Sequence, residues 1–308
     1  MSNLMFRAIR GPHFHKWPQP ARPVRKTNAA QHVSQERFSS TSTEHLSHLT
    51  RDGSLIMFKN PFNQADVFVI GTSNASREST ANIQQVIRSV EPNTVFLELD
   101  QERMNRLLSH TPLESDESFK SEIFKALSSH PSLKSNPLFG DGFIGRMARQ
   151  GFEKYIQRAL GIMKQFGLVP GEMFRAAIGE ARNKNSKVVL GGIDPRITLH
   201  SAMAGVKIPD FSNLNPSTLL KDMNIDPDNL RSIMSEAETM ETRETARRVR
   251  EGMKKELPQV YKALFTDREE YMNARLEKCE GKTVAVVGMM HMDAIEEHFK
   301  RGKGRLGS

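Results

Sequence analysis

Four short apolar runs, separated by helical patterns, constrain the fold of this chain more than any other feature. They are rich in β-branched residues and cover 67–71, 95–99, 188–191 and 284–288. Continuous apolar runs of this length are typical of strands that are buried on both faces, as in parallel sheets. Buried strands that alternate with helices predict an α/β fold, with a mostly parallel central sheet flanked by helices.

Helical periodicity marks the segments between these runs. Apolar residues spaced at i, i+3, i+4 and i+7 predict helices at 83–90, 152–163, 174–181 and 258–276. Residues 227–256 predict one long, highly charged helix with a thin apolar stripe, an excursion packed on one side of the domain. Three segments rich in Ser, Pro, Gly, Asn and Asp predict loops: 110–118, 130–145 and 205–226.

The first 38 residues differ in character from the rest of the chain. No acidic residue precedes Glu36, and a short basic amphipathic start is broken at Gly11-Pro12. An Arg-rich, acid-poor amphipathic segment is typical of a transit peptide, whereas an untargeted basic tail is the competing interpretation. We therefore predict a mitochondrial transit peptide at 1–38, cleaved after Phe38, with a plastid as the alternative organelle. A linker at 39–64, an α/β domain at 65–302 and a tail at 303–308 complete the predicted organisation.

The location of the positive charge argues against a nucleic-acid partner. The net charge is +8, and residues 1–38 hold seven Lys or Arg against one Glu, which is 7 − 1 = +6. Residues 39–308 therefore carry only 8 − 6 = +2, too little to attract a phosphate backbone strongly. Cys279 is the single cysteine, which excludes an internal disulfide and a cysteine-based zinc site. No apolar run is long enough for a transmembrane helix, so we expect a soluble domain.

Glycines and polar residues follow the predicted strands where an α/β sheet binds its ligands. Gly-Thr-Ser-Asn-Ala-Ser at 71–76 follows the first strand, Gly-Met-Met-His at 288–291 follows the last, and Glu98 and Asp100 end another. Ligands bind at the carboxyl ends of parallel strands, where helix N–H groups also attract anions. The candidate binding residues are Gly71, Thr72, Asn74, Ser76 and Gly288.

Simpler interpretations of these residues remain open. A histidine beside an apolar strand is commonly a hydrogen-bonded structural residue, and a carboxylate at a strand end is commonly a helix cap. No phosphate loop of the Walker type, no Gly-x-Ser-x-Gly elbow and no His-Glu-x-x-His motif occurs in the sequence.

Six segments, in order, resemble the motifs of the TraB family. The first is Val-Ile-Gly-Thr-Ser-Asn-Ala-Ser-Arg-Glu-Ser at 69–79, and the others lie at 96–103, 170–177, 190–199, 267–272 and 286–291. The resemblance covers residues 66–300. It implies an α/β fold shared with Gly-x-x-His metal-dependent proteases, haem-uptake proteins and erythromycin esterases. It also implies a hydrolytic, metal-assisted site built from two histidines and a glutamate.

The resemblance also assigns roles to four residues. His291 matches the second histidine and Glu98 the acidic position, so these two are the tentative ligands of a divalent metal. Arg175 and Arg268 match basic positions and complete the candidate catalytic set with Glu98 and His291.

Three departures from the family pattern fall on polar positions. Asn74 stands in the place of the first histidine, and asparagine neither shuttles protons near neutral pH nor binds zinc-like ions well. Met173 stands in the place of a glutamate, and Glu172, one position earlier, is rotated by about 100° on a helix. Gly192 and Ile193 replace a common Asp-Arg pair.

The departures favour a diverged, non-catalytic TraB-like protein that binds a peptide or small-molecule ligand in the organelle. The alternative is a metal-dependent hydrolase or peptidase that uses Glu98 and His291. A weak association with anionic membrane surfaces through Arg243, Arg247, Arg250 and Lys254 is a further possibility, against the interpretation of these residues as a solvated helix face. Residues 301–308 form no apolar tail, so we expect no membrane anchor there and favour the mitochondrial matrix.

Overall fold

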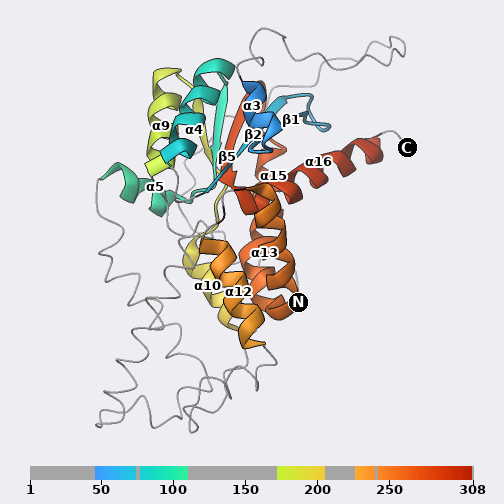
Figure 1. Ribbon diagram of the computed structural model, residues 1–308. Helices are drawn as coiled ribbons and strands as arrows, with labels where there is room; N and C mark the ends of the chain where they lie inside the picture. Colours follow the sequence, from blue (N-terminus) through green and yellow to red (C-terminus); the bar gives the residue numbers. More distant parts are fainter. Residues whose placement is uncertain are drawn as a thin grey trace. The chain divides into compact units, whose positions relative to one another are not determined.

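A five-stranded mixed sheet organises the part of the chain that the computed structural model describes. That part comprises residues 46–73, 77–109, 172–204, 226–238, 240 and 242–306, all within the compact unit Ser39–Ser308. The strands are β1 (Leu55–Lys59), β2 (Asp66–Thr72), β3 (Thr94–Leu97), β4 (Lys187–Leu190) and β5 (Thr283–Gly288), in the order β1-β2-β5-β3-β4. The pairings of β2, β5, β3 and β4 are parallel, and β1 is an antiparallel edge strand. The predicted mostly parallel sheet is confirmed (Figure 1).

The last strand in the chain, β5, lies in the middle of the sheet. Its Gly288 pairs with Thr72 of β2, and its Val286 pairs with Leu97 of β3. The carboxyl ends of these three parallel strands therefore meet along one edge of the sheet. Residues that follow β2, β3 and β5 are brought together there, far apart as they are in the sequence.

Helices flank the sheet, as predicted. They are α3 (Ser47–Arg51), α4 (Arg77–Val90), α5 (Gln101–Leu108), α9 (Glu172–Asn183), α10 (Pro195–Ala204), α12 (Pro227–Glu238), α13 (Arg243–Glu256), α14 (Pro258–Tyr261), the π-helix η3 (Lys262–Thr266), α15 (Asp267–Leu276), the 3₁₀-helix η4 (Met289–His291) and α16 (Met292–Leu306). Helices α4 and α9 pack on each other beside the sheet, where α9 contacts β3 and β4 (Figure 1). No helix in the described ranges is both long and apolar enough to cross a membrane.

Alternation along the strands divides the buried side chains between the two faces of the sheet. Val67, Val69, Phe96, Ala285 and Val287 belong to a core that also contains residues of α12, α13, α15 and α16. Because side chains alternate along a strand, their neighbours in β2, β3 and β5 point to the opposite face, toward α4 and α9. Both faces are covered, which explains why the strands form continuous apolar runs.

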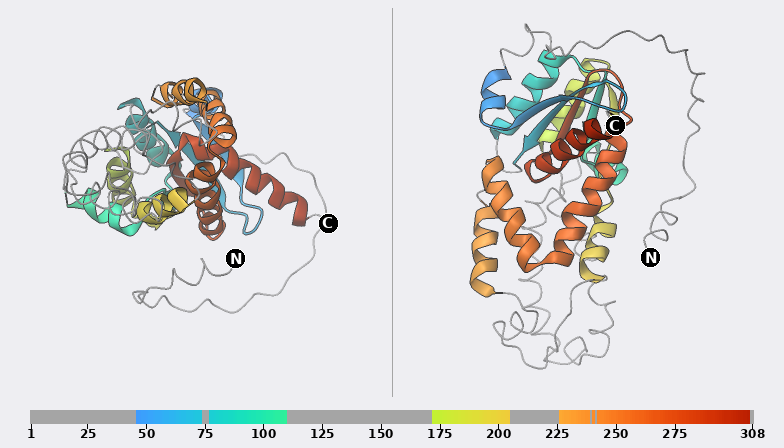
Figure 2. Two further views of the ribbon diagram at one scale, coloured as in Figure 1. Left: turned by 90° about the horizontal axis from the view of Figure 1, so that it is seen from below. Right: turned by 90° about the vertical axis from the view of Figure 1, so that its right-hand side faces the viewer.

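The charged excursion consists of two helices rather than one. Helix α12 ends at Glu238, and α13 begins after Thr242, whose side chain accepts a hydrogen bond from the N–H of Thr245. A threonine cap satisfies a backbone donor that would otherwise lack a partner, so it favours a new helix start. The two helices pack on each other and lie with α10 below the sheet in Figure 1 and in the right-hand view of Figure 2.

Residues 39–64, predicted as a linker, contain α3 and β1 in their described part. The sequence 55–59 holds a single β-branched residue, Ile56, so it lacks the signal that marks the buried strands. The predicted helix at 152–163 and the predicted loops at 110–118 and 130–145 lie outside the described residues, as does nearly all of 205–226.

Candidate functional site

Glu98 and His291 meet at the carboxyl edge of the sheet. Glu98 directly follows β3, and His291 ends the short helix η4 that follows β5. The Nε2 atom of His291 lies 3.4 Å from Oε1 of Glu98, and each side chain is only 2% exposed. The structure therefore brings together the two residues that were predicted from the sequence as catalytic residues and tentative metal ligands.

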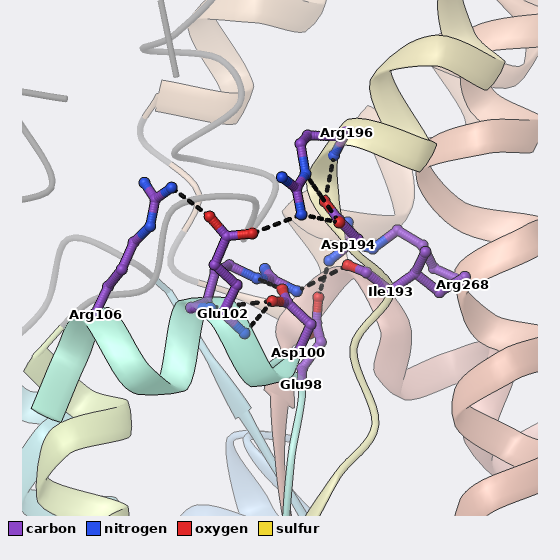
Figure 3. Close-up of polar contacts among 9 residues, drawn as sticks. Glu98, Asp100, Glu102, Arg106, Ile193, Asp194, Arg196 and Arg268 are labelled. Carbon is purple, nitrogen blue, oxygen red and sulfur yellow. Dashed lines mark hydrogen bonds and ion pairs between the residues drawn. The ribbon is translucent and has the colours of Figure 1, made fainter. Parts of the chain in front are cut away.

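Two donors of the same chain bind the carboxylate of Glu98. Arg268 donates from Nη2 to Oε1, and the backbone N–H of Gly288 donates to Oε2 over 2.6 Å. Arg268 is itself buried, and Figure 3 shows it reaching Glu98 from the neighbouring helix. Three of the four predicted catalytic residues thus form one buried cluster. The fourth, Arg175, lies partly buried on α9, which packs against α4 and β3.

The π-helix η3 explains how Arg268 reaches this position. Its Leu264 carbonyl accepts a hydrogen bond from Nη1 of Arg268 over 3.3 Å, and its Phe265 ring lies 5.8 Å from the ring of His291. Phe265 and Glu269 both contact His291, and Arg268 contacts Glu98, so the side chains of all three reach the same cluster. Single π-turns within α-helices occur frequently at functional sites.

Glu269 is a cluster residue that the sequence analysis missed. Its Oε1 lies 2.9 Å from Nδ1 of His291, so each ring nitrogen of this histidine faces a carboxylate. Arg250 of α13 pairs with the same carboxylate. The only sequence signal for Glu269 was its place beside Arg268. The neighbouring Glu270 has the same side chain but is exposed, so the sequence did not distinguish the cluster residue from the surface residue.

Charge contacts set the protonation of this cluster. Burial raises the pKa of Glu98, but His291 and Arg268, with the N–H of Gly288, lower that pKa to about 2. Burial also raises the pKa of Glu269, yet hydrogen bonding to His291 and Arg250 brings it below the usual range. Burial lowers the pKa of His291, whereas Glu98 and Glu269 raise it above its ordinary value. The arrangement favours two carboxylates and an imidazolium.

This arrangement does not fit a divalent metal ion. A histidine that binds a metal must offer it an unprotonated nitrogen, but both nitrogens of His291 face carboxylates of the same chain. The guanidinium groups of Arg268 and Arg250 occupy the two carboxylates. Within the described ranges, no group of three or more His, Cys, Asp or Glu side chains is arranged to hold a metal. Glu98 and His291, as placed here, are members of an ion-pair network.

The predicted binding residues in the described ranges contact their own chain. Thr72 donates from Oγ1 to the carbonyl of Val287 over 3.1 Å, and Gly288 donates to Glu98. A Cβ atom on Gly71 would lie 2.1 Å from Sδ of Met292, so glycine allows α16 to start close to β2. Asn74 and Ser76, the remaining predicted binding residues, lie outside the described residues.

A second charged group lies beside the cluster, where β3 and β4 end (Figure 3). Asp100 caps α5 by accepting hydrogen bonds from the N–H groups of Glu102 and Arg103, at 2.9 and 3.0 Å. The buried Arg103 pairs with Asp100 and donates to the carbonyl of Ile193 over 3.1 Å. The group continues outward through Glu102 to Arg106 and Arg196, and from Arg196 to Asp194.

Gly192 and Ile193, where the chain departs from the family pattern, have a structural role in this second group. A Cβ atom on Gly192 would lie 2.6 Å from the backbone carbonyl carbon of Leu99, so the two loops approach closely only with glycine there. The Ile193 carbonyl then serves as the acceptor for Arg103. Met173, the other described departure, is buried on α9 and packs as an apolar residue. These positions stabilise the fold without adding a free polar side chain.

Comparison with known proteins agrees with this architecture. Residues 56–301 match the TraB/PrgY/gumN family. A protein of Methanocaldococcus jannaschii described as "Uncharacterized protein MJ1365" is 26% identical over 249 residues, which are 79% of this chain and 55% of that protein. The chain thus spans about half the length of this relative. Because the family match extends over most of the sequence, the chain belongs to the TraB/PrgY/gumN family.

Proposed function

We propose that this chain is a diverged TraB-family protein that binds a peptide or small-molecule ligand in mitochondria and does not hydrolyse it. One observation carries the proposal: both ring nitrogens of His291 face carboxylates, those of Glu98 and Glu269. A histidine acts as a general base or a metal ligand only through an unprotonated nitrogen that is directed at its target. The described cluster offers no such nitrogen.

The departures from the family pattern support the same proposal. Asparagine at position 74 and methionine at position 173 remove titratable groups where the resemblance expects a histidine and a glutamate. Loss of one member of a catalytic constellation commonly costs orders of magnitude in rate. The apolar framework around the cluster is retained, so the fold persists without the full set of site residues.

The alternative function, a metal-dependent hydrolase, also has a specific observation in its favour. Glu98 and His291 lie 3.4 Å apart at the two positions that the resemblance assigns to the site. If Arg268 moved away from Glu98, the two side chains could offer an oxygen and a nitrogen to one ion. The two proposals therefore differ in metal content and in turnover.

Metal analysis of the purified full chain separates these proposals. Elemental mass spectrometry is applied to wild type, His291→Ala and the matched control His298→Ala, whose side chain on α16 is about one third exposed and bonded to Glu277. We expect no stoichiometric transition metal in any of the three, and no metal-stimulated cleavage of a peptide or ester panel. A stoichiometric metal that is retained in His298→Ala and lost in folded His291→Ala would overturn the proposal, and cleavage that follows the same pattern would establish the hydrolase.

The basic side of α13 gives less support to a membrane-surface role than its sequence suggested. Arg243 and Arg247 both pair with Asp293, and Arg250 pairs with Glu269. Three of the four positive charges are therefore already balanced within the fold. We expect no flotation with anionic liposomes at moderate salt, and salt-sensitive flotation would restore the membrane proposal.

A further inference from the structure

Arg250 connects α13 to the cluster around His291 through polar contacts. It pairs with Glu269 through Nη1, and the same atom donates to the Met290 carbonyl over 2.6 Å. Its Nη2 donates to the hydroxyl of Tyr261 over 2.8 Å. One guanidinium therefore binds three acceptors, one of which precedes His291 in the chain.

We propose that Arg250 and Glu269 form a positioning relay: Arg250 fixes Glu269, Glu269 fixes the imidazole of His291, and the α12–α13 pair thereby controls the geometry of the cluster. The inference rests on the proposed function in one respect, since it takes this cluster as the part of the protein that responds to ligand. The relay itself is defined by contacts and can be tested without knowing the ligand.

Aromatic packing makes Arg250 a rigid connection. The central carbon of its guanidinium lies 4.7 Å from the ring centroid of Phe265 and 5.4 Å from that of Tyr261. Stacking on aromatic faces and a planar set of donors restrict an arginine far more than a lysine. The Phe265 ring also contacts the ring of His291, so Arg250 and His291 share one aromatic neighbour. A displacement of Arg250 would be transmitted both through Glu269 and through this ring.

The relay starts in the helical excursion rather than in the sheet. Helix α13 packs on α12 and buries Ala246, Val249 and Met253 in the core. Arg247, about one turn before Arg250, and Arg243, about two turns before it, bind Asp293 at the start of α16. The face of α13 that carries these arginines is thus fastened to the segment that contains His291. A ligand that shifts the α12–α13 pair would therefore move Arg243, Arg247 and Arg250 together.

The relay is tested by the ring resonances of His291 in the full chain. The protein is labelled with ¹⁵N in its 10 histidines, and the His291 signals are assigned by their loss in His291→Gln. We expect the Nδ1–H resonance to shift in Glu269→Gln and also in Arg250→Gln, although Arg250 binds Glu269 and not the ring. In the double variant, the Arg250 change should add less to the shift than it causes by itself, because part of its effect passes through Glu269.

Two exposed neighbours supply the controls. Glu270→Gln and Arg248→Gln make the same charge changes on the same helices, and both should leave the His291 resonances as in wild type. If Arg250→Gln fails to fold, Arg250→Lys replaces it, since a lysine cannot bind three acceptors in one plane. Unchanged His291 signals in the folded Arg250 variant, or shifts that simply add in the double variant, would overturn the relay. Metal content tests the proposed function separately, so either idea can fail alone.

Discussion

Replacing Glu98 by glutamine gives the sharpest test of the buried cluster. The change keeps the shape of the side chain and removes the charge that faces Arg268 and His291. One pKa unit corresponds to about 1.4 kcal/mol. Lowering the pKa of Glu98 from 4.5 to about 2 therefore stabilises the folded state by about 3 kcal/mol.

The pH at which this stabilisation is lost follows from the direction of the change. A group whose pKa is lowered by folding stabilises the protein above its unfolded pKa, here 4.5, and the effect disappears as the pH falls through about 2. We expect Glu98→Gln to be less stable than wild type by about 3 kcal/mol at pH 6, and by less than about 1 kcal/mol at pH 2. His291 has an ordinary pKa of 6.5 that is raised in the folded state, so below pH 6 it is mostly charged in both states and contributes little to the slope.

Urea unfolding, followed by circular dichroism at several pH values, measures the difference. Glu244→Gln is the control, because its carboxylate is 80% exposed and pairs only with a surface arginine in the described structure. It should differ from wild type by less than about 0.5 kcal/mol at every pH. If Glu98→Gln does not fold, Glu98→Gln with Arg268→Met removes both charges and serves as the pH-independent reference. A difference between wild type and the Glu98 variant that stays constant from pH 6 to 2 would refute the reasoning.

Three further predictions concern the packing of two glycines, the protonation of His291 and the N-terminal segment. Gly191→Ala should destabilise the protein by about 2–3 kcal/mol in thermal unfolding, because its Cβ would lie 1.9 Å from the ring of Phe96. At Gly179 of α9 an added Cβ would meet no atom within 4 Å beyond its own helix backbone, so Gly179→Ala should instead stabilise the protein by about 0.5–1 kcal/mol. Equal effects of the two changes would contradict the packing. The pKa of His291 is raised by folding, so its protonation stabilises the folded state below pH 6.5, and this stabilisation is lost as the pH rises through the pKa of the folded state. Wild type, but not His291→Gln, should therefore become less resistant to urea between neutral and alkaline pH. N-terminal sequencing of the protein recovered from isolated mitochondria should begin at Ser39, after Phe38, whereas an intact N-terminus there would contradict the predicted cleavage.

The sequence was most informative where local pattern and tertiary structure agree. Runs of β-branched residues predicted β2 to β5, because a strand that is covered on both faces is a continuous apolar run in the sequence. The edge strand β1 was missed, since it is antiparallel and only partly buried beyond Leu55. Thr242 marks the break between α12 and α13, but a single capping residue inside a charged, helix-forming segment is a weak signal.

The cluster was predicted in part for a similar reason. Glu98 and His291 follow strands whose carboxyl ends must meet in a parallel sheet, so their contact could be expected from topology. The partners Glu269 and Arg250 depend on the π-turn at η3 and on where α13 packs, and neither is encoded in a short pattern. Sequence periodicity assumes a regular helix, so an inserted residue changes which side chain faces inward.

The central place of β5 has a consequence for how the chain acquires its structure. The hydrogen bond from Thr72 to the Val287 carbonyl joins residues 215 positions apart, and both β2 and β3 need β5 as a neighbour. Contacts between residues so far apart in sequence form slowly. During synthesis, the edges of β2 and β3 that pair with β5 lack a hydrogen-bonding partner until residues 283–288 have emerged. The sheet is therefore expected to close only late in translation. Under the mitochondrial import proposed above, this delay would keep the chain in the unfolded form that a translocation pore requires.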